Sequence, residues 1–207
     1  MSAPIRAALF DLGKVLVDFD WPRSVERMAQ EFALPDGRDL GLWLQLRDGD
    51  CERYGRGQMD DLTFLAALQR RFDPGRRLPT QRLRELWCDM FEPIPGAFAV
   101  VETLRTSLHV GLVSNTNAMH FEWLDRQYGI RARFAALTLS HEVAACKPEP
   151  EIYAHALRTA GCKPEEAVFV DDLPENVEAA RELGLHGIVF VSVPRLREEL
   201  TAFGLFV

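Results

Sequence analysis

The stretch Ala167-Val168-Phe169-Val170-Asp171-Asp172-Leu173-Pro174 joins a continuous apolar run to two adjacent carboxylates and a proline. A run without polar alternation is typical of a strand covered by helices on both faces, and proline is favoured at the first position of a helix. A second apolar run, residues 7–10, ends in the same way at Asp11. If the two strand ends converge, their carboxylates repel each other unless a cation lies between them. Mg²⁺ binds such oxygen ligands together with water and a substrate phosphate, so phosphoryl chemistry is the first hypothesis.

Five short apolar runs are predicted to be buried parallel strands, because each is continuous rather than alternating. They are Ile5–Phe10, His109–Val113, Phe134–Leu139, Ala167–Val170 and Gly187–Val191. Helical patterns lie between them, and Gly161 and Gly184 stand where two of these helices are expected to end. This alternation of strands and helices predicts an α/β fold with a Rossmann-like, doubly wound parallel sheet.

One stretch interrupts the alternation. Between about Asp18 and Phe91 the sequence shows helical patterns separated by turn signals and no convincing strand. An all-helical block inserted after the first strand is expected to form a cap over the strand ends, where ligands of such sheets bind. The predicted organisation is therefore an α/β core of residues 1–17 and 92–207, with a small helical cap of residues 18–91.

Composition narrows the classes of partner. The chain has 207 residues and a formal net charge of −7, which argues against a nucleic-acid surface with its clustered basic face. The four cysteines show no metal-binding spacing and are interpreted as free thiols. No apolar run approaches the ~20 residues of a membrane span, and the first strand begins too early for a signal peptide. We expect a cytoplasmic protein, monomer or homodimer, without nucleic-acid or membrane partners.

Four short motifs contain residues suited to phosphate chemistry. An aspartate after a strand, as in Phe10-Asp11-Leu12-Gly13, can attack phosphorus, although it can also cap a turn. In Val113-Ser114-Asn115-Thr116, a hydroxyl and backbone N–H groups follow a strand and suit phosphate oxygens, but small polar residues are also common in turns. Lys147 stands directly before a predicted helix, where the helix dipole disfavours a cation without a compensating anion. The fourth motif, Asp171-Asp172, has one more carboxylate than capping a helix requires.

In their order and spacing, these motifs resemble the haloacid dehalogenase superfamily, specifically its phosphatases with a small helical cap. The resemblance covers essentially the whole chain and is close to a branch of sugar-phosphate phosphatases that includes a glucose-1-phosphate phosphatase group. It implies that Asp11 is the nucleophile and that Mg²⁺ is the cofactor. The roles it implies are catalysis for Asp11, Ser114 and Lys147, phosphate binding for Ser114, Asn115 and Lys147, and metal binding for Asp11, the Gly13 carbonyl, Asp172 and Asp171. Asn176 falls where the family orients the lysine or the metal-bound waters.

Gly13 departs from the family pattern. Typical members have a second aspartate at this position, which protonates the leaving oxygen and then activates water, a contribution of about 10²–10⁴ in rate. The sugar-phosphate branch also has Asp-Leu-Gly here, so we interpret Gly13 as a variation compatible with catalysis. Asp18 and Asp20 are candidates to replace the acid, and the alternative role for both is to cap the first helix of the cap.

Three functions are therefore compared. The favoured hypothesis is a Mg²⁺-dependent phosphatase that hydrolyses small phosphate monoesters, with sugar phosphates expected, through an aspartyl-phosphate. A metal-independent 2-haloacid dehalogenase also lacks the second aspartate but does not need the pair Asp171-Asp172. A non-catalytic module that binds a phosphorylated metabolite is supported only by Gly13. Substrate choice is expected to lie in the cap, where the predicted loop of residues 47–57 offers arginines and a tyrosine to sugar hydroxyls or a second anion, unless it is merely solvated.

Overall fold

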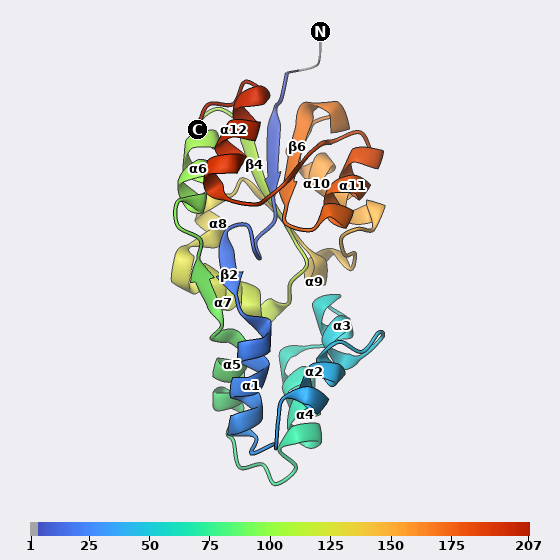
Figure 1. Cartoon of the computed structure of the whole chain (residues 1–207). Coiled ribbons are helices and arrows are strands. Elements are labelled where there is room, and N and C mark those ends of the chain that lie inside the picture. The colour runs from blue at the N-terminus through green and yellow to red at the C-terminus, as the bar shows by residue number, and fades with distance from the viewer. Residues whose placement is uncertain (1–3) are drawn as a thin grey trace.

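A five-stranded parallel sheet forms the centre of the larger part of the molecule (Figure 1). The computed structural model describes residues 4–207, so residues 1–3 of the predicted core lie outside the described part. In spatial order the strands are β5 (Ala136–Leu139), β4 (His109–Ser114), β1 (Ala7–Phe10), β6 (Ala167–Asp171) and β7 (His186–Val189). The five predicted strands are confirmed to within two residues at each end, and β1 lies in the middle of the sheet.

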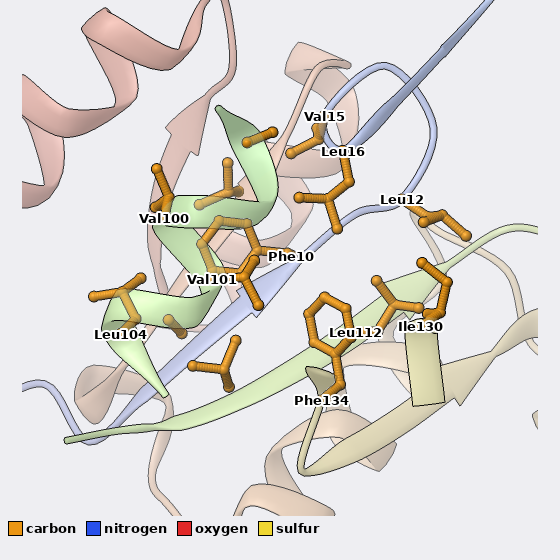
Figure 2. Close-up of a cluster of buried hydrophobic side chains, with 14 of the residues drawn as sticks. Phe10, Leu12, Val15, Leu16, Val100, Val101, Leu104, Leu112, Ile130 and Phe134 are labelled. Carbon is orange, nitrogen blue, oxygen red and sulfur yellow. The ribbon is translucent and has the colours of Figure 1, made fainter. Parts of the chain in front are cut away.

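Alternate residues of β1 point to opposite faces of the sheet, as the pleat requires. Ala8 and Phe10 pack into one hydrophobic cluster with α6 (Ala97–Leu104), α7 (Ala118–Tyr128), α8 (Ile130–Arg133) and α12 (Val193–Ala202). Figure 2 shows part of this cluster, with Val100, Val101 and Leu104 of α6 beside Phe10. Ala7 and Leu9 join a second cluster with α10 (Pro150–Ala160) and α11 (Pro174–Glu182). Helices thus cover both faces, which confirms the doubly wound α/β prediction and explains the fully apolar strands.

Five helices beyond the carboxyl ends of the strands form the cap (Figure 1). They are α1 (Trp21–Glu31), α2 (Arg38–Leu44), α3 (Asp50–Gly55), α4 (Asp61–Phe72) and α5 (Thr80–Cys88). The buried side chains of the cap form a hydrophobic cluster that also includes Met119 of α7, and within it Phe64 and Trp87 have ring centroids 4.8 Å apart. Asp20 caps α1 by accepting a hydrogen bond from the backbone N–H of Arg23 at 3.0 Å, which is the structural role weighed for it above.

Two strands at the base of the cap were not expected. The strands β2 (Val17–Phe19) and β3 (Phe91–Pro93) form an antiparallel ribbon where the chain leaves and re-enters the core. The prediction that no strand lies between about Asp18 and Phe91 is therefore wrong at its two margins. Strands of three residues are too short for a periodic pattern, and their pairing partners are distant in sequence.

The expectation of a loop over residues 47–57 is also wrong in part, because residues 50–55 form the helix α3. Two further short elements, α9 (Ser140–Val143) and the 3₁₀ turn η1 (Pro164–Glu166), follow β5 and precede β6. Within residues 4–207, none of the helices combines the length and the apolar character needed to cross a membrane.

Candidate active site

The carboxyl ends of three adjacent strands bring the predicted residues together. Asp11 directly follows β1, Ser114 is the last residue of β4, and Asp171 is the last residue of β6. Because β1 pairs in parallel with both β4 and β6, these ends lie at the same edge of the sheet. Lys147 reaches this edge from the segment before α10.

Lys147 is the centre of the charge arrangement. Its Nζ lies 2.7 Å from Oδ1 of Asp11 and 2.7 Å from Oδ2 of Asp171, and only 2% of its side chain is exposed. Burial alone lowers the pKa of Lys147, but the charges of Asp11 and Asp171 more than offset this and raise it above the ordinary value. The lysine is therefore a fixed cation between two carboxylates, as its position before a helix had indicated.

Asp11 is the carboxylate predicted to be the nucleophile. Burial raises its pKa to about 6, with Lys147 acting against this shift and Asp171 adding to it. Its Oδ1 also accepts a hydrogen bond from the backbone N–H of Leu12 at 2.7 Å. At neutral pH the side chain is therefore mainly ionised, and the hydrogen bond from Leu12 fixes its orientation.

Three carboxylates at this edge form a group suited to a divalent cation. Oxygens of Asp11, Asp171 and Asp172 all lie within 4.8 Å of one another. Burial raises the pKa of Asp172, and the nearby charge of Asp171 raises it further. Three carboxylates face the single ammonium of Lys147, which leaves negative charge in excess, and an all-oxygen donor set of this kind fits Mg²⁺. The residues present are thus suited to the metal that the resemblance implies.

Two asparagines orient the charged groups. The side chain of Asn115 accepts a hydrogen bond from the backbone N–H of Lys147 at 2.8 Å and donates one to its carbonyl at 2.9 Å. Asn176 donates to Oδ1 of Asp171 at 3.0 Å. Asn176 therefore supports the carboxylate that binds the lysine. The amide of Asn115 fixes the backbone that carries Lys147, a contact that no pattern in the sequence indicated.

The cap contacts the core next to Lys147. The guanidinium of Arg56 forms a bidentate ion pair with Glu149, with N–O distances of 2.7 and 3.2 Å. Glu149 in turn accepts a hydrogen bond from the backbone N–H of Cys146 at 2.9 Å. Arg56 and Glu149 are 93 positions apart, so this link between the cap and the lysine segment was not predictable from local sequence.

A small cavity marks the space between the strand ends and the base of the cap. Its volume is about 120 Å³, and Gly13, Ser114 and Trp21 are among the residues that line it. A larger cavity, about 520 Å³, lies between α1 and the β2–β3 ribbon and is lined by none of Asp11, Ser114, Lys147 or Asp171. The volume of a cavity therefore does not identify the site. The cluster of charged groups at the strand ends identifies it.

Comparisons with known proteins agree with this architecture. The chain is 26% identical over 212 residues to D-ribitol-5-phosphate phosphatase of Bacteroides thetaiotaomicron, covering 95% of this chain and 97% of that protein. A crystal structure of a HAD family enzyme from the same organism, in complex with magnesium and inorganic phosphate, matches with a TM-score of 0.81 and 26% identity, covering 91% and 96% of the two chains. An L-2-haloacid dehalogenase from Xanthobacter autotrophicus matches with a TM-score of 0.61 and 20% identity over 98% and 85%, and shares the fold alone.

The sequence also matches the family described as haloacid dehalogenase-like hydrolase over residues 5–184, a range that contains all four motifs. The match covers most of the chain and agrees with the sheet order and with the cluster of charged residues at the strand ends. The protein therefore belongs to the haloacid dehalogenase-like hydrolase family.

Proposed function

We propose that the protein is a Mg²⁺-dependent phosphatase that hydrolyses small phosphate monoesters, sugar phosphates among them, through an aspartyl-phosphate. The observation that carries the proposal is the placement of Lys147 between Asp11 and Asp171, beside the third carboxylate of Asp172. The relative named D-ribitol-5-phosphate phosphatase supports the choice of a polyol or sugar phosphate as substrate.

The chain's own residues have distinct tasks in the proposed reaction. A carboxylate oxygen of Asp11 attacks phosphorus, and the bond from phosphorus to the ester oxygen breaks, with its electron pair leaving on that oxygen. Ser114 and Lys147 hold the oxygens of the phosphoryl group, and Asn115 keeps the lysine segment in place through its two hydrogen bonds. Water then attacks phosphorus, which releases inorganic phosphate and restores the Asp11 carboxylate.

The metal would be held by the carboxylates of Asp11, Asp171 and Asp172 and by the carbonyl of Gly13. Bound there, Mg²⁺ would neutralise negative charge on the phosphoryl group as it is transferred.

The two alternatives are less well supported by the site. A dehalogenase of the metal-independent kind has no need of a third carboxylate near the nucleophile, whereas Asp172 lies within 4.8 Å of both partners. A non-catalytic module does not require an ionised aspartate that is paired with a buried lysine at the carboxyl ends of the strands.

Release of inorganic phosphate from a panel of sugar phosphates, with Mg²⁺ and with a chelator, tests the proposal. We expect Mg²⁺-dependent release that Asp11→Asn abolishes. Asp20→Asn is the matched control, because asparagine also caps α1 and the variant should retain activity. Full Mg²⁺-dependent activity of Asp11→Asn, or release of halide rather than phosphate, would refute it.

A further inference from the structure

We infer that Ser140 is a positioning residue of the active site. Its hydroxyl holds the loop of residues 114–116, which carries proposed phosphate-binding groups, and ties this loop to helix α3 of the cap. The inference rests on the proposed function and adds to the same site a residue that lies outside the four motifs. We assign Ser140 no contact with the reacting atoms, since it acts through the backbone of this loop.

The sheet places Ser140 at the same edge as the other site residues. β5 pairs in parallel with β4, and its last residue, Leu139, lies opposite Ser114. Ser140 follows directly, so it stands at the end of a fourth adjacent strand, beside the ends that carry Asp11, Ser114 and Asp171. Only 1% of Ser140 is exposed. A buried hydroxyl at this position has to find its hydrogen-bond partners within the protein.

Three backbone groups contact this hydroxyl. Its Oγ accepts a hydrogen bond from the N–H of Thr116 at 2.9 Å. The same Oγ lies 2.7 Å from the carbonyl oxygen of Gly55 and 2.9 Å from that of Thr116. A hydroxyl has one proton, so these two carbonyls share it, and the Gly55 carbonyl is the nearer acceptor. Ser140 thereby connects a core loop to a cap residue that is 85 positions away in the sequence.

The hydrogen bond to Thr116 fixes one side of the loop after β4. Because the peptide group is planar, holding the Thr116 N–H also sets the orientation of the Asn115 carbonyl. The Thr116 carbonyl contacts the same core segment a second time, since its oxygen lies 3.3 Å from Nδ1 of His141. On its other side the loop is held by the backbone of Lys147, through two hydrogen bonds with the Asn115 side chain. The loop is therefore fixed between two segments of the core.

On the cap side the hydroxyl meets the end of a helix. Gly55 is the last residue of α3, and the last carbonyls of a helix have no donor within the helix itself. Ser140 supplies a donor to the Gly55 carbonyl. The ion pair of Arg56 and the close approach of Gly57 to the core continue this contact. Three consecutive cap residues therefore dock on the core, and Ser140 links the first of them to the phosphate-binding loop.

Loss of the hydroxyl is expected to affect the phosphoryl group rather than the alcohol part of the substrate. Without it, the N–H of Thr116 and the carbonyl of Gly55 lose a hydrogen-bond partner. A loop that moves to find other partners carries Ser114 and Asn115 with it, and a displacement of about 1 Å can cost about 10²-fold in rate. Every phosphate monoester presents the same phosphoryl group to these residues. We therefore expect a loss of turnover that does not depend on the alcohol.

The experiment compares two esters in the Mg²⁺-loaded protein: 4-nitrophenyl phosphate and the sugar phosphate that the wild-type protein hydrolyses fastest. Ser140→Ala is expected to lower kcat/KM for both by the same factor of about 10–100, and for the sugar phosphate the loss should lie in kcat rather than in KM. Ser24→Ala is the matched control, because Ser24 is also buried and its hydroxyl donates to the Asp20 carbonyl at 2.8 Å within the cap. The control should keep wild-type kinetics.

A double-mutant cycle with Asn115→Ala tests whether Ser140 acts through the loop. Asn115 and Ser140 hold the same loop from opposite sides, so their losses in kcat are not expected to multiply. The double variant should be slower than Asn115→Ala by less than the factor that Ser140→Ala causes alone. Asn115→Ala combined with Ser24→Ala should have the activity of Asn115→Ala.

Wild-type kcat in Ser140→Ala, a loss confined to the sugar phosphate, or losses that multiply in the cycle would overturn this inference and leave the proposed function intact. Release of phosphate from no ester by the wild-type protein would overturn both. If Ser140→Ala does not fold, amide hydrogen exchange of the wild-type protein decides the question. The Thr116 amide should then exchange as slowly as the amides of β4, and exchange as fast as in an exposed loop would overturn the inference.

Discussion

The ammonium of Lys147 lies 2.7 Å from the carboxylate of Asp11, and both side chains are largely buried, with 2% and 11% exposed. The two residues are far apart in the sequence and meet at the edge of the sheet. Their contact fixes the protonation state of both groups, because burial without a partner would neutralise either one.

Removing the charge of Lys147 is expected both to destabilise the protein and to lower its activity. Lys147→Met leaves Asp11 and Asp171 buried without a cation, which should lower the free energy of unfolding of the metal-free protein by about 3–5 kcal/mol. Activity should fall by about 10²–10³-fold, because a fixed positive charge at the phosphoryl group is lost. Urea unfolding and phosphate release measure the two effects, and a Lys147→Met protein of unchanged stability would contradict the burial argument.

Loss of the Asn115 amide is expected to affect turnover more than folding. Asn115→Ala removes both hydrogen bonds to the backbone of Lys147, and orienting partners of this kind typically contribute about 10–100-fold in activity. Asn115→Asp keeps the acceptor for the Lys147 N–H but places a carboxylate oxygen against the Lys147 carbonyl, so its activity is expected to be no higher than that of the alanine variant. Steady-state kinetics with a parallel melting curve separates the two effects; an Asn115→Ala variant with wild-type kcat would contradict the positioning role.

The ion pair between Arg56 and Glu149 is expected to hold the cap against the core. A double-mutant cycle with Arg56→Ala and Glu149→Gln should give a coupling free energy of about 1 kcal/mol, since the pair is bidentate but partly exposed. Arg53→Ala is the control, because within residues 4–207 the side chain of Arg53 pairs only with Asp50 of its own helix. The Arg56 variant should raise KM while the Arg53 variant does not; equal effects of the two would show that the cap is held elsewhere.

A pair of glycines at the same boundary offers a second test of cap placement. Gly57 has a φ of +69°, and a Cβ there would lie 2.0 Å from the carbonyl oxygen of His141, so Gly57→Ala should displace the cap and raise KM. At Gly55 nothing lies within 4 Å of the same atom, and Gly55→Ala should be neutral or stabilise by up to about 1 kcal/mol. Kinetics and thermal melting of both variants check this, and identical behaviour would place the boundary away from Gly57.

The raised pKa of Asp11 predicts how pH and metal act together. Its pKa of about 6 in the folded protein exceeds the ordinary 3.8, so in the metal-free protein its contribution to stability is fully present below pH 3.8 and is lost as pH rises through 6. Mg²⁺ competes with that proton and should raise the melting temperature more at about pH 7.5 than at about pH 5.

A second buried group, His120, changes the stability with pH in the opposite direction, so its effect has to be separated from that of Asp11. His120 has a pKa of about 4, below its ordinary 6.5, so its contribution is present above pH 6.5 and is lost as pH falls through 4. Asp11→Asn removes the titration of Asp11 and keeps that of His120. The difference in stability between the wild-type protein and this variant therefore isolates the contribution of Asp11. A Mg²⁺ stabilisation that is as large at low pH as at high pH would show that Asp11 does not bind the ion.

Local sequence was sufficient for the five strands of the parallel sheet and for the position of each charged motif. The runs that end at Asp11 and Asp171 are apolar without interruption, because helices cover both faces of those strands, and this burial leaves a pattern in a few consecutive residues. Parallel strands place their carboxyl ends at one edge, so the pattern could suggest a meeting of Asp11 with the Asp171-Asp172 pair, and the pairing of β1 with β6 in the folded sheet brings it about.

Contacts between distant segments were decided by the tertiary structure. The amide of Asn115 holds the backbone of Lys147, and Arg56 binds Glu149. Each contact depends on the orientation of a side chain toward a residue that only folding brings near. The sequence around either residue therefore does not predict its partner. The sequence by itself therefore determined which chemical groups are present and which strand they follow. Folding determined which of these groups are charged and which neighbouring residues hold them in place.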